Sequence, residues 1–236
     1  MQEMLPCVEA YLSARSWGNV PAMFGRSFRV APLAQGEYNL NYLLTAPDTR
    51  LVLRVNDGTQ IGREDQIHYE YRALELLQQS GVTPTPHFVD DTREHIDRGV
   101  LIMAYLPGEP LDYRRDLEAA AKLLAVVHQV PVAEEKNHLI REDAPLSLIF
   151  QECSTLLQSY FRSPLADPGI KAYLQEVEAW ADAARAQERF FQEDPWPCIV
   201  NTEVNSGNFF VHRELRTLHL VDWELPRYGD PTQELS

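Results

Sequence analysis

Long apolar runs are missing from this sequence. Nowhere do its 236 residues approach the roughly 20 consecutive apolar residues that a membrane-spanning helix needs, so we expect no membrane partner. The N-terminus has an acid and a proline where a secretory signal would be basic and then apolar. We therefore expect a cytoplasmic protein rather than a membrane or secreted one.

Cysteine and basic residues are scarce as well. The three cysteines, Cys7, Cys153 and Cys198, are far apart and without metal-ligand spacing, which predicts reduced thiols rather than disulfides or zinc ligands. Lysine and arginine together number 21 against 35 acidic residues, a formal net charge of −14. Nucleic-acid binding needs a basic surface, so we expect no nucleic-acid partner. The negative charge is compatible with a cationic substrate.

The first part of the chain has the pattern of an antiparallel sheet with helices. Apolar residues recur at helical spacing between Met4 and Leu12 and between Ile67 and Leu77, where Gly81 follows as a C-terminal cap. Proline and aspartate at residues 46–49 predict a hairpin turn. The predicted strands are residues 27–34, 38–45, 50–55, 87–90 and 99–105.

Helices dominate after a connector at residues 106–111, and β structure returns at the end of the chain. We predict an α+β fold of two lobes, an N-terminal lobe of residues 1–105 and a mainly helical C-terminal lobe of residues 106–236 with a late hairpin. Trp180, Trp196 and Trp223 are expected in the core. The predicted helical faces are Leu117, Ala121, Leu124 and His128; Leu156, Tyr160 and Phe161; and Ile170, Leu174, Val177 and Ala181.

Two groups of residues carry candidate chemistry. In the last hairpin, Glu203, Asn208 and Asp222 supply carboxylate and amide oxygens of the kind that Mg²⁺ prefers, although a polar turn with a helix cap would look the same. In the first part, Gly36 lies in a turn that could approach phosphate or be a plain β-turn. Arg54 lies in an apolar strand and would pair with Glu70, at the surface or in a site.

Taken in order, these segments resemble the aminoglycoside phosphotransferase and choline kinase-like family, which has a protein-kinase-like fold. The similarity runs from about Ser27 to the C-terminus. The matching motifs are G-E-Y-N-L-N-Y (residues 36–42), L-V-L-R-V (51–55), Y-E-Y-R-A-L-E-L-L (69–77), L-I-M-A-Y-L-P-G (101–108), L-L-A-V-V-H (123–128), S-G-N-F-F-V (206–211), and V-D-W-E with Y-G-D-P (221–231).

The resemblance implies a phosphotransferase that uses ATP and Mg²⁺ to phosphorylate a hydroxyl of a small molecule, amine-bearing molecules included. It also implies a role for each matching residue. The turn from Gly36 to Asn39 would cover the phosphates, Arg54 would contact them and Glu70 would pair with Arg54. Met103, Ala104 and Leu106 belong to the hinge that would bind adenine. Asn208 and Asp222 would hold Mg²⁺, and Glu203 would stand in the catalytic-base position.

The chain departs from the family pattern at two places. Where the family reads His-Gly-Asp and then asparagine five positions after the aspartate, this chain has Asn201, Thr202 and Glu203, then Asn208. The chain also stops at Ser236, so we expect either a truncated protein or an acceptor site that is built differently. Two alternatives to the enzyme stay open, a nucleotide-binding pseudokinase with little or no transfer and a structural remnant that binds no nucleotide. The sequence indicates no oligomeric state.

Overall fold

A computed structural model of the chain describes residues 1–59, 63–133, 137–193 and 195–234. The chain divides into two compact units, one of Met1–Leu139 with Asn201–Pro226 and one of Ile140–Val200 with Arg227–Ser236. The boundary at residue 105 that the sequence predicts is a different division, and it stays a prediction. Each unit is described by itself below.

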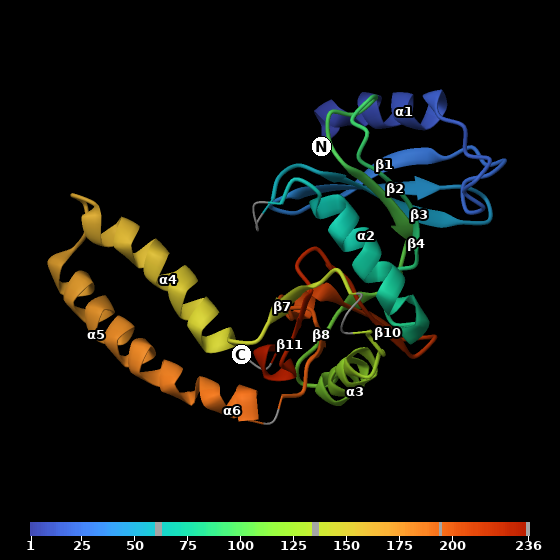
Figure 1. Ribbon diagram of the computed structural model, residues 1–236. Coiled ribbons are helices and arrows are strands. Elements are labelled where there is room, and N and C mark those ends of the chain that lie inside the picture. Colours follow the sequence, from blue (N-terminus) through green and yellow to red (C-terminus); the bar gives the residue numbers. More distant parts are fainter. Residues whose placement is uncertain (60–62, 134–136, 194, 235–236) are drawn as a thin grey trace. The chain divides into compact units, whose positions relative to one another are not determined.

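The first unit is built on a five-stranded antiparallel sheet (Figure 1). Its strand order is β1-β2-β3-β5-β4. The turn predicted from proline and aspartate connects β2 to β3, and within it Ala46 N donates a hydrogen bond to Thr49 O at 2.9 Å. The strands are β1 (Arg29–Gln35), β2 (Asn39–Thr45), β3 (Arg50–Asn56), β4 (Pro86–Asp90) and β5 (Val100–Ala104).

Helices cover this sheet because their apolar faces match its buried side chains. Helix α1 (Leu5–Ala14) packs Val8 and Tyr11 into the core formed with the sheet, and helix α2 (Gln66–Leu77) contacts β4 and β5. A short 3₁₀ turn, Gln78–Ser80, ends at Gly81, whose φ of 69° is the left-handed conformation that glycine adopts without strain. The predicted cap is confirmed. Another 3₁₀ turn, Gln2–Met4, precedes α1.

Helix α3 (Leu117–His128) forms as predicted, but the predicted buried face is wrong. Its buried residues are Ala120, Leu123 and Val127, whereas Leu117 is 57% exposed. The helix carries two neighbouring apolar stripes, and the periodicity of the sequence cannot choose between them. Only the packing of the folded unit selects one.

A second, three-stranded antiparallel sheet in the first unit carries the late hairpin, in the order β10-β9-β6. A 3₁₀ turn, Ser206–Asn208, leads into β9, and the β9–β10 hairpin returns the chain so that Val221 N donates to Asn208 O at 2.8 Å. Val221, which is hydrogen-bonded to Asn208, directly precedes Asp222. The hairpin therefore folds Asp222 back beside Asn208, as the sequence predicts. The strands are β6 (Glu109–Pro110), β9 (Phe209–His212) and β10 (Thr217–Leu220).

The second unit combines a small sheet, in the order β7-β11-β8, with a long helical hairpin (Figure 1). Helix α4 (Pro145–Arg162) and helix α5 (Pro168–Ala184) form where the sequence predicts helices, but their apolar positions are not a buried core. Trp180 is 73% exposed and Trp196 is 61% exposed, so of the three tryptophans only Trp223 is buried as predicted. The other elements are β7 (Ile140–Glu142), β8 (Cys198–Val200), β11 (Arg227–Gly229), α6 (Arg189–Glu193) and the 3₁₀ turns Arg185–Glu188 and Pro231–Glu234.

Among the described residues, no helix is both long enough and apolar enough to cross a membrane. Cys198 is buried, while Cys7 and Cys153 are exposed, and all three are free thiols. The prediction of a mixed α+β chain with an N-terminal antiparallel sheet and a helical region is confirmed.

Candidate active site

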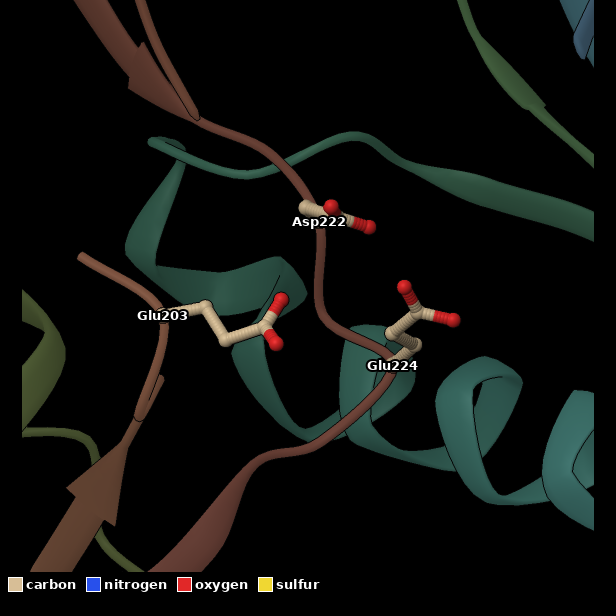
Figure 2. A group of neighbouring side chains, drawn as sticks. All are labelled: Glu203, Asp222 and Glu224. Carbon is tan, nitrogen blue, oxygen red and sulfur yellow. The ribbon is translucent and has the colours of Figure 1, made fainter. Parts of the chain in front are cut away.

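Three carboxylates converge in the first unit (Figure 2). Glu203 lies in the loop that follows β8, and Asp222 and Glu224 lie in the segment after β10. Their carboxylate oxygens lie within 4.8 Å of one another. The three side chains line a cavity of about 160 Å³ together with the turn at residues 36–39, Asn41 and Arg54. The structure therefore brings together the turn at residues 36–39, Arg54 of strand β3 and the carboxylates that follow β8 and β10.

Asn201 holds the Glu203 loop to the Asp222 loop. Its side chain is fully buried, its Nδ2 donates to the backbone oxygen of Asp222 at 2.9 Å, and its Oδ1 accepts from Glu203 N at 3.1 Å. One amide thus connects the two acid-bearing loops. Thr202, at a φ of 66°, adds a hydrogen bond from its hydroxyl to Leu225 O at 2.9 Å. The residue that replaces the family histidine is a structural connector here.

Asn208 is oriented by the same loop. Its Nδ2 donates to Glu203 O at 2.8 Å, so the amide oxygen is the atom that remains to serve as a ligand. Asn208 and Asp222 also line one pocket. Asp222 has a φ of 64°, a left-handed conformation that is uncommon for a residue with a side chain and is often found where a site constrains the backbone.

Arg54 connects strand β3 to helix α2 and to the Asp222 loop. Its Nη1 donates to Glu70 Oε1 at 2.6 Å and to Asp222 Oδ1 at 3.1 Å, and its Nε donates to Asn41 Oδ1 at 3.0 Å. Arg54 and Glu70 are both buried, at 6% and 2% exposure. The pairing expected from the sequence is present, and it is buried rather than at the surface. The contact to Asp222 extends it into the carboxylate cluster.

Glu224 closes the other side of the cluster. Its Oε2 accepts from Asn39 Nδ2 at 2.6 Å and from Gln66 Nε2 at 3.1 Å. Asn39 begins β2 just after the Gly36 turn, and Gln66 begins α2. Glu224 therefore connects the turn at residues 36–39 to the segment that carries Asp222.

Negative charge gathers at the guanidinium of Arg54, because the carboxylates of Glu70, Asp222 and Glu224 all act on it. Burial first, and then the neighbouring Asp222, raise the pKa of Glu224 to about 7. Burial works against the charge of Arg54, but Glu70, Asp222 and Glu224 outweigh it and raise its pKa further. Burial raises the pKa of Glu70, and the adjacent Arg54 opposes that rise. A bound cation would relieve this excess of negative charge.

An apolar pocket of about 360 Å³ adjoins the cluster and shares Arg54 and Asp222 with it. Met103, Ala104, Tyr105 and Leu106 form one wall of this pocket. Ala104 N and Tyr105 N donate to Thr85 O at 2.8 Å and Arg50 O at 3.3 Å, whereas the backbone of Leu106 has no hydrogen bond within the described part of the chain. The other apolar walls come from Leu33, Ala34, Val52, Pro84, Phe210 and Val221.

All predicted site residues lie at these two adjoining pockets or, for Glu70, behind Arg54; the roles assigned to them stay predictions. Gly36 is bonded to Asn39 O through its N–H at 2.9 Å, and a side chain there would meet that oxygen at an ordinary 3.8 Å, so this conformation does not require glycine. The sequence analysis missed Glu224, Asn41 and Gln66. For Glu224 a signal was present, an acid two positions after Asp222 in V-D-W-E.

Solved structures with the same fold are enzymes of phosphoryl transfer. A putative aminoglycoside phosphotransferase from Ralstonia eutropha JMP134 has a TM-score of 0.64 at 17% identity and covers 98% of this chain and 68% of its own. Choline kinase from Cryptosporidium parvum Iowa II has a TM-score of 0.63 at 13% identity, and the match covers 94% of this chain and 66% of that protein. A thermostable mutant of aminoglycoside phosphotransferase APH(4)-Ia was solved in ternary complex with AMP-PNP and hygromycin B. It has a TM-score of 0.62 at 17% identity, and the match covers 97% of this chain and 74% of that protein.

These similarities confirm the protein-kinase-like fold. The chain spans about two thirds to three quarters of the length of these proteins, 66–74%. No curated protein matches it. The model of the Phosphotransferase enzyme family, APH, matches residues 29–236, which is most of the chain. Because this model matches so much of the chain, the chain belongs to the Phosphotransferase enzyme family.

Proposed function

We propose that this chain is an ATP- and Mg²⁺-dependent phosphotransferase that moves the γ-phosphoryl group of ATP to a hydroxyl of a small molecule. The observation that carries the proposal is the position of Arg54. Its guanidinium is bonded at once to Glu70 and Asp222 and lines both the carboxylate cavity and the apolar pocket. Phosphoryl transfer asks mainly for positioning and charge neutralisation, which is what such an arrangement supplies.

The apolar pocket is suited to the adenine of ATP. A flat base needs apolar walls and one or two backbone groups at its edge, and the segment from Met103 to Leu106 offers both. The backbone of Leu106 is the natural partner, because its hydrogen-bonding groups are not used within the described chain. The phosphates would then extend past Arg54 toward Asn39 and the Gly36 turn, which line the carboxylate cavity.

The donor atoms at the cluster fit a magnesium ion. Carboxylate oxygens of Asp222 and Glu224 and the amide oxygen of Asn208 are hard ligands, and the excess negative charge around Arg54 favours a divalent cation. When bound, Mg²⁺ would neutralise phosphate charge. We therefore add Glu224 to the proposed ligands Asn208 and Asp222, the pair that the resemblance implies; the closeness of Glu224 to Asp222 supports this.

Glu203 is the candidate for the group that receives the proton of the acceptor hydroxyl. Its carboxylate lies in the cluster, and its backbone is held by Asn201 and Asn208. A glutamate extends farther than the family's aspartate, but the loop is bonded in place around it. Because the transition state of phosphoryl transfer is largely dissociative, the demand on this base is small.

The acceptor would be a small alcohol, and amine-bearing alcohols are the first to test. The solved relatives point that way, since one is a choline kinase and another was solved with hygromycin B. The net charge of −14 also favours cationic ligands.

A thermal-shift titration with ATP, with and without Mg²⁺, tests nucleotide binding. Binding to the folded state raises the melting temperature by mass action, by an amount that grows with the ratio of ligand concentration to Kd. We expect a larger shift with Mg²⁺ than without it. Asp222→Ala should remove that difference, while an exposed control, Asp97→Ala, should keep it. The absence of any shift at millimolar ATP would overturn the proposal.

A second candidate function is a nucleotide-binding module without transfer. The observation that favours it is Asn201, which uses both ends of its buried amide to connect the two loops and has no imidazole. ADP release separates the candidates. A chain that binds ATP with Mg²⁺ but releases no ADP with any of a panel of amine-bearing alcohols would be a binding module.

A further inference from the structure

One face of helix α2 lies against the segment that carries Asp222 and Glu224. Gln66, Tyr69 and Glu70 are spaced i, i+3 and i+4, a spacing that places them on the same side of the helix. All three side chains are buried, at 1%, 1% and 2% exposure. We call these three residues the α2 face. Because they lie in the interior, their polar atoms need partners within the protein.

Two members of the α2 face are bonded to this segment directly. Gln66 Nε2 donates to Glu224 Oε2 at 3.1 Å. The hydroxyl of Tyr69 donates to the backbone oxygen of Pro226. These contacts hold the segment at positions 224 and 226, and both lie wholly within the first unit.

The third member, Glu70, reaches the same segment through Arg54. Nη1 of Arg54 donates to Glu70 Oε1 at 2.6 Å and to Asp222 Oδ1 at 3.1 Å. The α2 face is therefore connected to positions 222, 224 and 226, which are alternate positions of one short segment. Three attachment points restrict the backbone of this segment, and with it the directions in which Asp222 and Glu224 point.

The amide of Gln66 can bind Glu224 in one orientation only. An ionised carboxylate accepts hydrogen bonds and cannot donate them, so Nε2 of Gln66 faces Glu224 and Oε1 faces away. Oε1 is buried and has no hydrogen-bond partner within the part of the chain that the structure describes. A buried acceptor without a donor costs free energy that an apolar side chain of the same length would not cost. Stability alone therefore does not explain a glutamine at this position.

The bonds to Glu224 leave one of its carboxylate oxygens available. Oε2 accepts from Gln66 and from Asn39 Nδ2, whereas Oε1 accepts no hydrogen bond from any residue in the described ranges. Glu224 lines the carboxylate cavity together with Asp222. Oε1 is thus the atom of Glu224 that remains to bind a cation, and the contact from Gln66 fixes which of the two oxygens remains.

We propose that Gln66 and Tyr69 are positioning residues for the magnesium site. From the α2 face they hold residues 222–226 in the conformation in which Asp222 and Glu224 line one cavity. Each acts through this segment and has no place among the proposed ligands of the cation. The inference rests on the proposed function, because it concerns the site in which we place Mg²⁺.

The benefit that Mg²⁺ brings to ATP binding tests this inference. Thermal-shift titrations give the apparent Kd of ATP in excess Mg²⁺ and in EDTA, because the shift depends on the ratio of ligand concentration to Kd. Residues that orient metal ligands typically change metal affinity by about 10–100-fold when they are replaced. We expect Gln66→Met and Tyr69→Phe each to reduce the ratio of the two Kd values by about 10-fold or more. The Kd in EDTA should stay that of the parent.

Gln78→Met is the matched control, because it makes the same change at an exposed residue in the 3₁₀ turn after α2. We expect it to keep the parent's ratio of Kd values. The melting temperature without ligand gives a second readout. Gln66→Met removes a buried oxygen that has no donor, so its melting temperature should be no lower than that of the parent. Loss of the magnesium benefit without loss of stability is the signature of a positioning residue.

The outcomes separate this inference from the proposed function. A parent whose ATP binding does not depend on Mg²⁺ would overturn the magnesium site and this inference together. A parent with the dependence, and variants at Gln66 and Tyr69 that keep its full ratio, would overturn this inference alone. A lower melting temperature with an unchanged ratio would give Gln66 a purely structural role and would contradict the inference as well.

Discussion

Arg54 shows how one buried charge organises this site. A guanidinium inside a protein is costly unless it is paired, and here Glu70, Asp222 and Asn41 accept its hydrogen bonds. The same contacts aim the cation at the cavity in which we place the phosphates. At this residue, stability and the proposed function depend on the same atoms.

Removing one partner of this pair should destabilise the fold strongly. Arg54→Met leaves the buried Glu70 without its cation, and Glu70→Leu removes the buried member of the two ion pairs of Arg54, leaving the pair with the more exposed Asp222. We expect each substitution to lower the free energy of unfolding by about 3–5 kcal/mol. Urea denaturation of the parent and of each variant measures the free energy of unfolding.

The double variant Arg54→Met/Glu70→Leu is the control, because it leaves no unpaired member of the pair. We expect it to lose less stability than the sum of the single variants. Additive losses would mean that the two side chains do not interact in the folded protein.

Glu203 tests whether the cluster performs chemistry. Glu203→Gln keeps the length of the side chain and removes its charge, so we expect ATP binding to persist in the thermal-shift assay. Transfer to an accepted alcohol, followed as ADP release, should fall by about 10²-fold, the low end of the usual contribution of a general base, because a largely dissociative transition state asks little of that base.

Glu214→Gln, at the exposed turn of the β9–β10 hairpin, is the matched control and should keep full activity. Unchanged ADP release in Glu203→Gln would show that the carboxylate is not the base.

At the scale of elements, the β9–β10 hairpin is anchored to the start of α3 by a carboxylate. The carboxylate of Asp116 accepts hydrogen bonds from Arg213 Nη1 at 2.6 Å, from Arg213 Nη2 at 2.7 Å and from Asp112 N at 3.0 Å. The hydrogen bonds from Arg213 are the main cause that lowers the pKa of Asp116 to about 2. The hairpin that carries Asn208 is thus held at its far end as well.

Acid should loosen this anchor in a defined pH range. The pKa of Asp116 is lower in the folded state than the roughly 3.9 of an unfolded aspartate, so its contribution to stability is complete above pH 4 and is lost as the pH falls toward 2. Asp116→Asn should therefore lower stability at pH 6 and make less difference at pH 2. Thermal melts of parent and variant across this range measure it. A difference that stays constant with pH would contradict the assignment.

The helical elements show where periodicity stops being informative. Helices α3, α4 and α5 were all predicted, yet the predicted buried face of α3 was wrong and none of the apolar positions of α5 is buried. An amphipathic pattern says that one side of a helix avoids water. It does not say which element covers that side.

At the scale of the whole molecule, the order of the motifs was the strongest information. Gly36, Arg54, Glu70, Met103, Asn208 and Asp222 are spread over most of the chain, and the fold gathers them at two adjoining pockets or behind them. The family model and the solved structures agree with that order. The division into two compact units differs from the two lobes predicted at residue 105, because residues 106–139 and residues 201–226 both belong to the first unit.

Local pattern was sufficient for the longer strands and helices, because short-range spacing dictates local backbone structure, but strands β6, β7 and β11, of two or three residues each, were not predicted. The order of the motifs, through the family resemblance, was sufficient for the fold and for most members of the site. The third carboxylate, Glu224, its clamp to Asn39 and Gln66, and the connecting role of Asn201 came from the tertiary structure alone. These contacts join residues as many as 185 positions apart, and no local rule relates such positions.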